Sequence, residues 1–329
     1  MTDLASLLSC LHHTPEDDVL WLAVADRLEE QGETDRAELL RLSRRLRGMA
    51  EDGERWAMEG RVRGLVNGGV RPCVPEIVNS IGMRFALIPP GTFWMGSPED
   101  EADRSGDETD RSGDETQHEV TLTRPFWMGV SPVTQSQYEA VTGKNPSYFS
   151  KKGAGKAEVR KMDTGAFPVE TVSWQDAVEF CEKLSALAEE KEGKRLYRLP
   201  GEAEWEYSCR GGLASKPFHF GDTLDKTLAN FQVSGLQRTS AVGSYPPNAF
   251  GLQDMHGNVW EWCQDWYGDY PTGPAVDPTG PDEGAYRVFR GGGWGNDSGF
   301  CRSACRGGSG PSDRGDGLGF RAALVPPSK

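Results

Sequence analysis

Apolar residues recur at helical spacing within residues 1–65. An apolar side chain at every third or fourth position predicts an amphipathic helix that buries one face. Two such series are present, the first being Leu20, Trp21, Val24 and Leu28 and the second Ala37, Leu39, Leu40, Leu42 and Leu46. Residues 14–17, with the sequence TPED, are typical of a helix start, because threonine can cap the helix and the acids suit its positive end. We therefore expect a small helical module, a hairpin whose first helix ends at Gly32.

The pattern changes after a linker at residues 66–74. From residue 75 the apolar runs are short and are broken by glycine and proline, which predicts strands joined by turns. Residues 85–88 and the alternating residues 118–123 are predicted strands. Helices are expected over residues 135–142 and 174–187, because Thr134 and Ser173 can cap their first turns. Residues 75–326 are thus expected to form one α+β domain.

Composition excludes several classes of function. Lys and Arg number 36 against 50 Asp and Glu, which gives a net charge of −14 and a pI of about 4.9. Such a chain repels phosphate backbones and anionic lipid, so no nucleic acid partner is expected. Neither a basic and apolar leader nor an apolar run near twenty residues is present, which predicts no membrane insertion and a cytoplasmic location.

Cysteine and histidine spacings do not favour a zinc or iron site. The seven cysteines include no C-x-x-C pair, and the five histidines do not recur at spacings that bind metal. An odd number of scattered cysteines also argues against a disulfide framework.

The segment 99–116 is acidic and contains a perfect tandem repeat. Residues 103–109 have the sequence DRSGDET, and residues 110–116 repeat it. A polar, acidic repeat is typical of a surface loop. Alternating carboxylates could also form a calcium loop, although Gly and Glu do not fall at EF-hand positions. The surface loop is the preferred interpretation.

An ordered series of motifs runs from residue 82 to residue 321. Its members are GM at 82–83, IPPGTFWMGS at 88–97, PVT at 132–134, PVETVSW at 168–174, RLPGEAEWEY at 198–207, NAFGL at 248–252, GNVWEW at 257–262, RGGGW at 290–294 and GFR at 319–321. Together, residues 75–326 resemble the formylglycine-generating-enzyme, or sulfatase-modifying-factor, family. The resemblance implies a C-type-lectin-like α+β fold with little regular secondary structure. The helical module resembles one found at the start of many multidomain planctomycete proteins.

The resemblance implies one structural calcium ion. Its ligands would be the side chains of Asp254 and Glu261 and the backbone carbonyls of Gly257 and Val259. Hard oxygen ligands at a tight turn suit Ca²⁺. The family has asparagine where this chain has Asp254, which exchanges one oxygen ligand for another. A hydrogen-bonded turn without metal is the alternative.

Catalytic members of the family oxidise a substrate cysteine with two cysteines that bind copper. Paired thiolates suit Cu(I) because sulfur is a soft ligand. In this chain Asn296 stands where the first cysteine is expected, and Cys301 matches the CRSA motif of non-catalytic relatives. A catalytic pair is therefore not expected. The alternative is an oxidoreductase that converts cysteine to formylglycine with copper at Cys301 and Cys305.

The C-terminal segment 290–321 resembles the variable region of diversity-generating-retroelement proteins. Residues 295–317 are rich in the amino acids that adenine-directed mutagenesis of AAC codons produces. These positions lie between the expected framework residues, which are Trp294, Cys301, Arg302, Ala304 and Arg321. The resemblance implies a non-catalytic protein that presents an adaptable surface to a protein or another macromolecular ligand, as an antibody does. An accessory family member without such variation is a further alternative.

The predicted ligand-binding residues share this segment and are expected to be exposed, apart from the framework residue Trp294. They are Trp294, Gly295, Asn296, Asp297, Ser298, Gly299, Phe300, Cys305, Gly307, Gly308, Ser309, Gly310, Ser312, Asp313, Gly315, Asp316 and Gly317.

Overall fold

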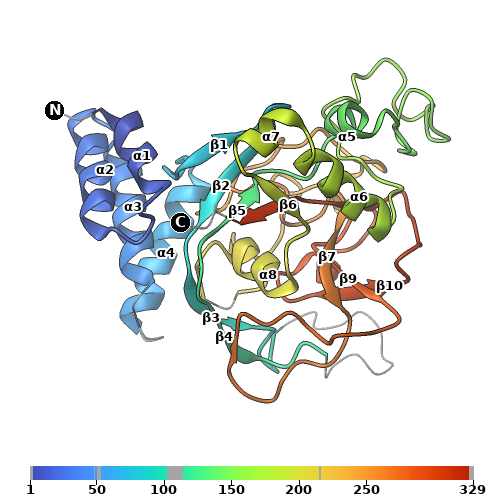
Figure 1. Ribbon diagram of the computed structural model, residues 1–329. Coiled ribbons are helices and arrows are strands. Elements are labelled where there is room, and N and C mark those ends of the chain that lie inside the picture. Colours follow the sequence, from blue (N-terminus) through green and yellow to red (C-terminus); the bar gives the residue numbers. More distant parts are fainter. Residues whose placement is uncertain (1–2, 48, 50–52, 102–113, 215, 326–329) are drawn as a thin grey trace.

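The computed structural model describes residues 3–47, 49, 53–101, 114–214 and 216–325. A stack of helices lies beside a larger domain of short strands, loops and helices (Figure 1). The helices of the stack are α1 (Leu4–Leu11), α2 (Asp18–Glu30), α3 (Thr34–Leu46) and α4 (Gly53–Asn67). The expected hairpin is present as α2 and α3, but α1 and α4 enlarge the module. Helix α4 also runs into the expected linker.

Helix α2 begins at a different cap from the one predicted. The carboxylate of Asp17, rather than Thr14, accepts hydrogen bonds from the backbone N–H of Val19 at 2.9 Å and of Leu20 at 3.2 Å. Aspartate is among the strongest capping residues, so the helix starts after it. The predicted apolar face is confirmed, because Trp21, Val24, and Leu28 are buried.

The module docks on the larger domain through α3, α4 and the residues that follow α3. Leu39 of α3 and Leu65 of α4 pack in one apolar cluster with Leu213 of the larger domain. At the edge of this cluster, the Arg47 guanidinium donates to the Pro90 carbonyl at 2.8 Å. The Glu59 carboxylate accepts the N–H of Ala214 at 2.8 Å. Apolar and polar contacts therefore both fix the module.

The larger domain contains three sheets among the described residues. The five-stranded sheet has the order β1 (Glu76–Val78), β2 (Arg84–Ile88), β5 (Phe126–Gly129), β12 (Ala323–Val325) and β6 (Leu196–Arg198). The four-stranded sheet has the order β10 (Arg306–Ser309), β9 (Arg287–Arg290), β7 (Trp260–Trp266) and β11 (Leu318–Phe320). The small sheet joins β3 (Gly91–Met95), β4 (His118–Leu122) and β8 (Ala275–Val276). The pairs β7–β11 and β4–β8 are parallel and the others antiparallel.

Helices pack beside the sheets, and two of them begin where the sequence predicts, although the helix expected over 174–187 ends at Ser185. They are α5 (Gln135–Thr142), α6 (Trp174–Ser185), α7 (Ala188–Glu192) and α8 (Glu202–Arg210). Thr134 and Ser173 form capping boxes at the starts of α5 and α6, as expected. The α+β class with a helical module is thus confirmed. Of the described helices, none combines the length and the apolar character that crossing a membrane requires.

Candidate functional site

The predicted binding segment, residues 290–321, follows one edge of the four-stranded sheet. It leaves β9, forms a 3₁₀ turn η2 (Gly299–Cys301), returns along the sheet edge as β10 and enters β11. Pairing sets Arg306 of β10 opposite Arg290 of β9. The loops 291–305 and 310–317 are therefore both anchored by strands at their two ends.

Buried arginines attach this segment to the core of the domain. The pairs are Arg290 with Glu206, Arg302 with Glu101 and Glu115, Arg306 with Glu202, and Arg321 with Glu261. All four guanidinium side chains are almost completely buried. A buried charge is costly unless an opposite charge lies beside it, so each pair specifies one position for the segment.

The structure exposes most of the predicted ligand-binding residues on two stretches of chain, 294–300 and 308–317. Trp294 is half-buried, and the exposed or half-exposed residues are Gly295, Asn296, Asp297, Ser298, Gly299, Phe300, Gly308, Ser309, Gly310, Ser312, Asp313, Gly315, Asp316 and Gly317. Their neighbours Cys301 to Arg306 are buried. Whether the exposed residues bind a ligand stays a prediction.

Two members of the predicted set are buried, and the expectation of exposure is wrong for them. Cys305 is only 7% exposed. Gly307 is buried opposite Phe289, and a Cβ atom added to Gly307 would lie 2.2 Å from Cε2 of Phe289. Position 307 is therefore fixed as glycine by its cross-strand neighbour.

Three polar members of the set hold the loops in shape. The Asp297 carboxylate accepts the N–H of Gly299 at 2.9 Å. The Asn296 side-chain oxygen accepts the N–H of Gly293 at 3.0 Å and the indole N–H of Trp260 at 2.9 Å. The Asp313 carboxylate accepts the N–H of Gly310 at 2.9 Å and also the hydroxyl of Ser309. Replacing Asn296 or Asp313 would therefore change the loop backbone as well as the surface.

The two cysteines of the alternative copper site lie in the interior of the domain. All seven cysteines are free, and Cys301 and Cys305 are both buried. Burial raises the pKa of Cys305 to about 12 and raises that of Cys301 well above its ordinary value. Cys301 packs in an apolar cluster with Phe218 and Phe231. Burial therefore disfavours, at both positions, the thiolate form that binds Cu(I).

The two side chains predicted to bind calcium accept hydrogen bonds from protein groups. The Glu261 carboxylate accepts hydrogen bonds from Arg321 at 2.8 and 3.0 Å and from the Trp205 indole at 2.7 Å. The Asp254 carboxylate accepts the N–H of Gly243 at 2.6 Å, while its second oxygen is buried without a hydrogen-bond partner. Burial raises the pKa of Asp254 to about 6. Glu261 is thus paired with Arg321, whereas one oxygen of Asp254 lacks a protein partner. The calcium site, with the carbonyls of Gly257 and Val259, stays a prediction.

The described residues contain no cluster of three or more His, Cys, Asp or Glu able to hold a metal ion. Most of the tandem repeat, residues 103–113, lies outside the described part of the chain, as does the calcium-loop interpretation that rests on it. Glu101, which precedes the repeat, and Glu115, near the end of its second copy, both contact Arg302, at 2.7 and 2.9 Å. The ends of the acidic segment are thus tied to the predicted binding segment.

A cavity of about 680 Å³ lies beside the binding segment. Trp294, Gly295 and Asp316 contribute one side of its lining. The rest comes from two other loops and consists of Tyr148, Phe149, Glu158, Gln232, Gly235, Leu236 and Gln237. The sequence pattern does not single out these residues, although the adjacent aromatics Tyr148 and Phe149 in loop 143–165 are a signal for their part of the wall.

A buried carboxylate orders the aromatic wall of this cavity. Glu170 accepts the N–H groups of Tyr148 at 2.9 Å and Phe149 at 2.8 Å, and the hydroxyl of Thr171 at 2.6 Å. Burial raises the pKa of Glu170 to about 7 against these hydrogen bonds. Phe149 in turn meets the Trp294 ring edge to face, with 5.3 Å between the ring centres. The cavity wall is therefore preorganised.

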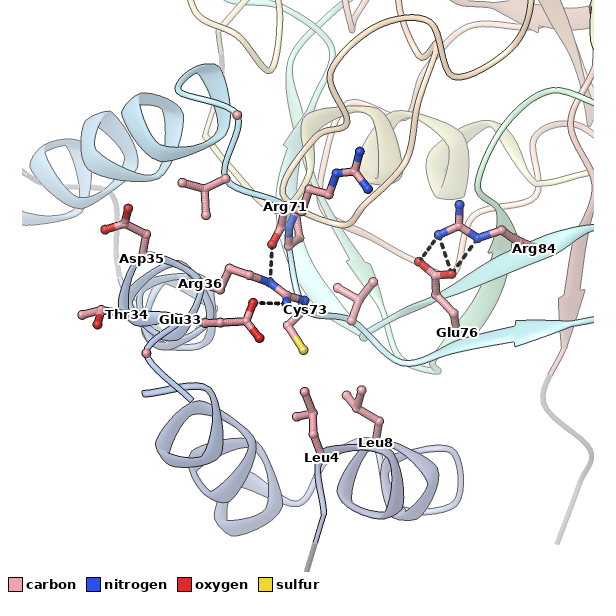
Figure 2. A pocket seen from close by; sticks show the side chains of 15 residues that line it. Leu4, Leu8, Glu33, Thr34, Asp35, Arg36, Arg71, Cys73, Glu76 and Arg84 are labelled. Carbon is pink, nitrogen blue, oxygen red and sulfur yellow. Dashed lines mark hydrogen bonds and ion pairs between the residues drawn. The ribbon is translucent and has the colours of Figure 1, made fainter. Parts of the chain in front are cut away.

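Another cavity of about 680 Å³ lies between the helical module and the larger domain. Figure 2 shows ion pairs between Glu33 and Arg36 and between Glu76 and Arg84 in its lining. Arg36 donates to Glu33 and, at 3.0 Å, to the Arg71 carbonyl, and Arg84 forms two hydrogen bonds of 2.9 Å with Glu76. This cavity therefore lies where the module meets the larger domain, and four of its charged side chains form ion pairs with one another.

A family model described as the sulfatase-modifying factor enzyme 1-like domain matches residues 79–325. Among curated proteins, the formylglycine-generating enzyme of Streptomyces coelicolor is 40% identical over 174 residues, which cover 47% of this chain and 52% of that protein. The serine/threonine-protein kinase pkn1 of Chlamydia pneumoniae is 33% identical over 257 residues, 73% of this chain and 37% of that protein. The chain thus spans between about a third and about half of these relatives.

Two solved structures share the fold of this chain at higher coverage. Treponema denticola variable protein 1 is 29% identical with a TM-score of 0.62, and the match covers 77% of this chain and 99% of that one. PvdO from Pseudomonas aeruginosa is 30% identical with a TM-score of 0.62, and the match covers 76% of this chain and 97% of that one.

Proposed function

The chain belongs to the sulfatase-modifying factor enzyme 1-like family, and from this premise we propose that it is a non-catalytic ligand-binding member. It displays residues 294–317 of its C-type-lectin-like domain to a protein or another macromolecular ligand. The surface is of the kind that a diversity-generating retroelement rewrites, and the similarity to Treponema denticola variable protein 1 supports this.

The observation that carries the proposal is the separation of exposed and buried positions along this segment. Gly295, Asp297, Ser298, Ser312 and Asp316 are exposed or half-exposed. Cys301 to Arg306 between them are buried and anchored by ion pairs. Small polar residues on a rigid frame can be replaced without disturbing the core, as in antibody loops. The adjoining cavity, lined by Trp294, offers a concave site of the size that ligands occupy.

Location and excluded partners are part of the same proposal. Seven free cysteines are typical of a reducing compartment, which favours the cytoplasm. The charge of −14 disfavours nucleic acid as the ligand.

A display library tests the proposal. Gly295, Asp297, Ser298, Ser312 and Asp316 are randomised together, and a matched library randomises Cys301, Arg302 and Arg306. We expect most members of the first library to resist protease and to yield binders to unrelated target proteins, whereas the second library unfolds. Widespread unfolding in the first library, or a folded library without binders, would overturn the proposal.

The second candidate function is oxidation of a cysteine to formylglycine, and the 40% identity to a formylglycine-generating enzyme favours it. It requires Cu(I) at Cys301 and Cys305. A Cu(I) titration of the full chain, with Cys301→Ser and Cys305→Ser as controls, separates the two functions. Tight binding that both substitutions abolish, with O₂-dependent conversion of a cysteine peptide, would replace the binding proposal.

A further inference from the structure

The loop between α5 and α6 gathers basic side chains in an otherwise acidic chain. Figure 1 shows this loop extending from the domain beside α5. Residues 144–161 contain a single acidic residue, Glu158, although acids outnumber bases by 50 to 36 in the chain as a whole. The basic residues of this stretch are all exposed and are Lys144, Lys151, Lys152, Lys156, Arg160 and Lys161. We call residues 144–161 the basic loop.

The six basic side chains form no ion pair within the part of the chain that the structure describes. Exposed lysines elsewhere do form such pairs, as Lys183 does with Glu179 and Lys216 with Asp222, both at 2.7 Å. Like charges that are held close together repel one another and produce a local positive potential. Carboxylates of another molecule would neutralise this potential, so the basic loop is electrostatically complementary to an acidic partner.

Backbone and apolar contacts hold the basic loop in one shape. The buried carboxylate of Glu170 accepts the N–H groups of Tyr148 at 2.9 Å and Phe149 at 2.8 Å. Gly155 donates its N–H to the Tyr148 carbonyl at 3.0 Å. Phe149 and Val159 pack in one apolar cluster. The basic side chains are thus carried on an ordered backbone, which lowers the entropy lost when a partner binds.

A cavity of about 380 Å³ lies between the basic loop and α5. Its basic lining residues are Lys144, Lys151 and Lys152, and Ser136 and Thr164 add hydroxyl groups. Two carboxylates, Glu139 and Asp163, also line it, and Asp163 accepts the N–H of Gly165 at 3.2 Å. The lysines outnumber the carboxylates, and ammonium and hydroxyl groups both donate hydrogen bonds to carboxylate oxygens. The cavity therefore suits an acidic side chain.

We propose that the basic loop is a docking surface for an acidic segment of a partner protein, whose carboxylates pair with the lysines and enter the cavity beside α5. The inference goes beyond the proposed function, because the six basic residues lie outside residues 294–317. A short acidic segment matches the loop, whereas the phosphate backbone of a nucleic acid would extend beyond it over a chain with a net charge of −14. The loop also lines the cavity beside Trp294, so the docked segment would lie next to the predicted ligand surface.

The experiment measures binding of a fluorescein-labelled peptide of ten glutamates to the full chain by fluorescence anisotropy. A labelled glycine–serine peptide and a labelled single-stranded RNA, each of the same number of units, are the comparison probes. We expect the glutamate peptide to bind at least tenfold more tightly than either probe. Its affinity should fall at least tenfold as sodium chloride rises from about 50 to about 300 mM, because salt screens exposed charges.

Two triple variants locate the binding site. Lys144→Gln, Lys151→Gln and Lys152→Gln together should weaken binding of the glutamate peptide at least tenfold. The matched control combines Lys183→Gln, Lys191→Gln and Lys194→Gln, which removes the same charge from exposed positions outside the loop and should change affinity less than twofold. Thermal denaturation checks that both variants fold.

Three results would overturn the proposal. They are no binding of the glutamate peptide at low salt, equal losses of affinity in the two variants, and tighter binding of the RNA than of the peptide. Equal losses would indicate attraction by net charge alone, and preference for RNA would assign the loop to nucleic acid. Residues 294–317 are unchanged in both variants, so each of these results leaves the proposed function to its own test.

Discussion

Arg302 and Glu115, which are 187 positions apart in the chain, form a buried two-pronged ion pair with N–O distances of 2.9 and 3.0 Å. Burial would raise the pKa of Glu115, but the hydrogen bonds and charge of Arg302 lower it below its ordinary value. Arg302 also reaches Glu101 at 2.7 Å. One framework residue thus joins the predicted binding segment to both described ends of the acidic segment 99–116.

Arg302→Met should lower the free energy of unfolding by about 3–5 kcal/mol, because it leaves two buried carboxylates without their counterion. Chemical denaturation measures this loss. Arg314→Met is the matched control, since the Arg314 pair with Asp176 is partly exposed and should contribute about 1 kcal/mol or less. Equal losses in the two variants would contradict the conclusion that the buried ion pairs of Arg302 stabilise the domain.

Gly307→Ala should destabilise the domain by about 1–3 kcal/mol, because its methyl group would collide with Phe289. Gly295→Ala, in the same segment, places a methyl group where no atom lies within 4 Å and should change stability by less than about 0.5 kcal/mol. Thermal denaturation of the two variants tests the division between fixed and replaceable glycines. That division would be wrong if the two changes had the same effect.

In the native chain, Cys301 and Cys305 should not react with a thiol reagent near neutral pH, because burial restricts access and raises the pKa of Cys305 to about 12. Cys10 is exposed and should react readily. Mass spectrometry of the labelled peptides, before and after unfolding, assigns the reactive positions. Rapid labelling of Cys301 and Cys305 in the folded protein would favour the oxidoreductase.

Glu170 should make stability depend on pH in one direction. Its folded pKa of about 7 lies above the ordinary value of 4.5, so the folded state holds the proton more tightly. The contribution of protonated Glu170 to the free energy of unfolding is fully present below pH 4.5 and is lost as pH rises through about 7. Relative to Glu170→Gln, the native chain should lose up to about 3 kcal/mol between these limits. Urea denaturation across this range measures the difference, and a constant difference would contradict the assignment.

Local signals in the sequence were sufficient for several elements of the fold. The capping boxes at Thr134 and Ser173 depend on residues three positions apart, and both helices begin where predicted. The start of α2 was misplaced because Asp17, another strong cap, lies within the same short segment as Thr14. Signals confined to one turn therefore predict that an element exists better than they predict its first residue.

The errors in the candidate site come from contacts between distant residues. Gly307 looks like an ordinary loop glycine until Phe289 is placed opposite it. The pairing of Arg302 with Glu115 and the cavity wall at Tyr148 likewise require the assembled fold. Composition could identify the segment as adaptable but could not separate its replaceable positions from those that packing fixes.

The most direct test of the binding proposal is the sequence of the DNA that flanks the gene. We predict a reverse-transcriptase gene and a near-copy of the codons for residues 290–321 that differs almost only at adenines. The differences should fall on exposed positions such as Asp297, Ser298 and Ser312 and should spare the codons for Arg302 and Gly307. Absence of such a copy, or differences concentrated on the buried framework, would contradict the account.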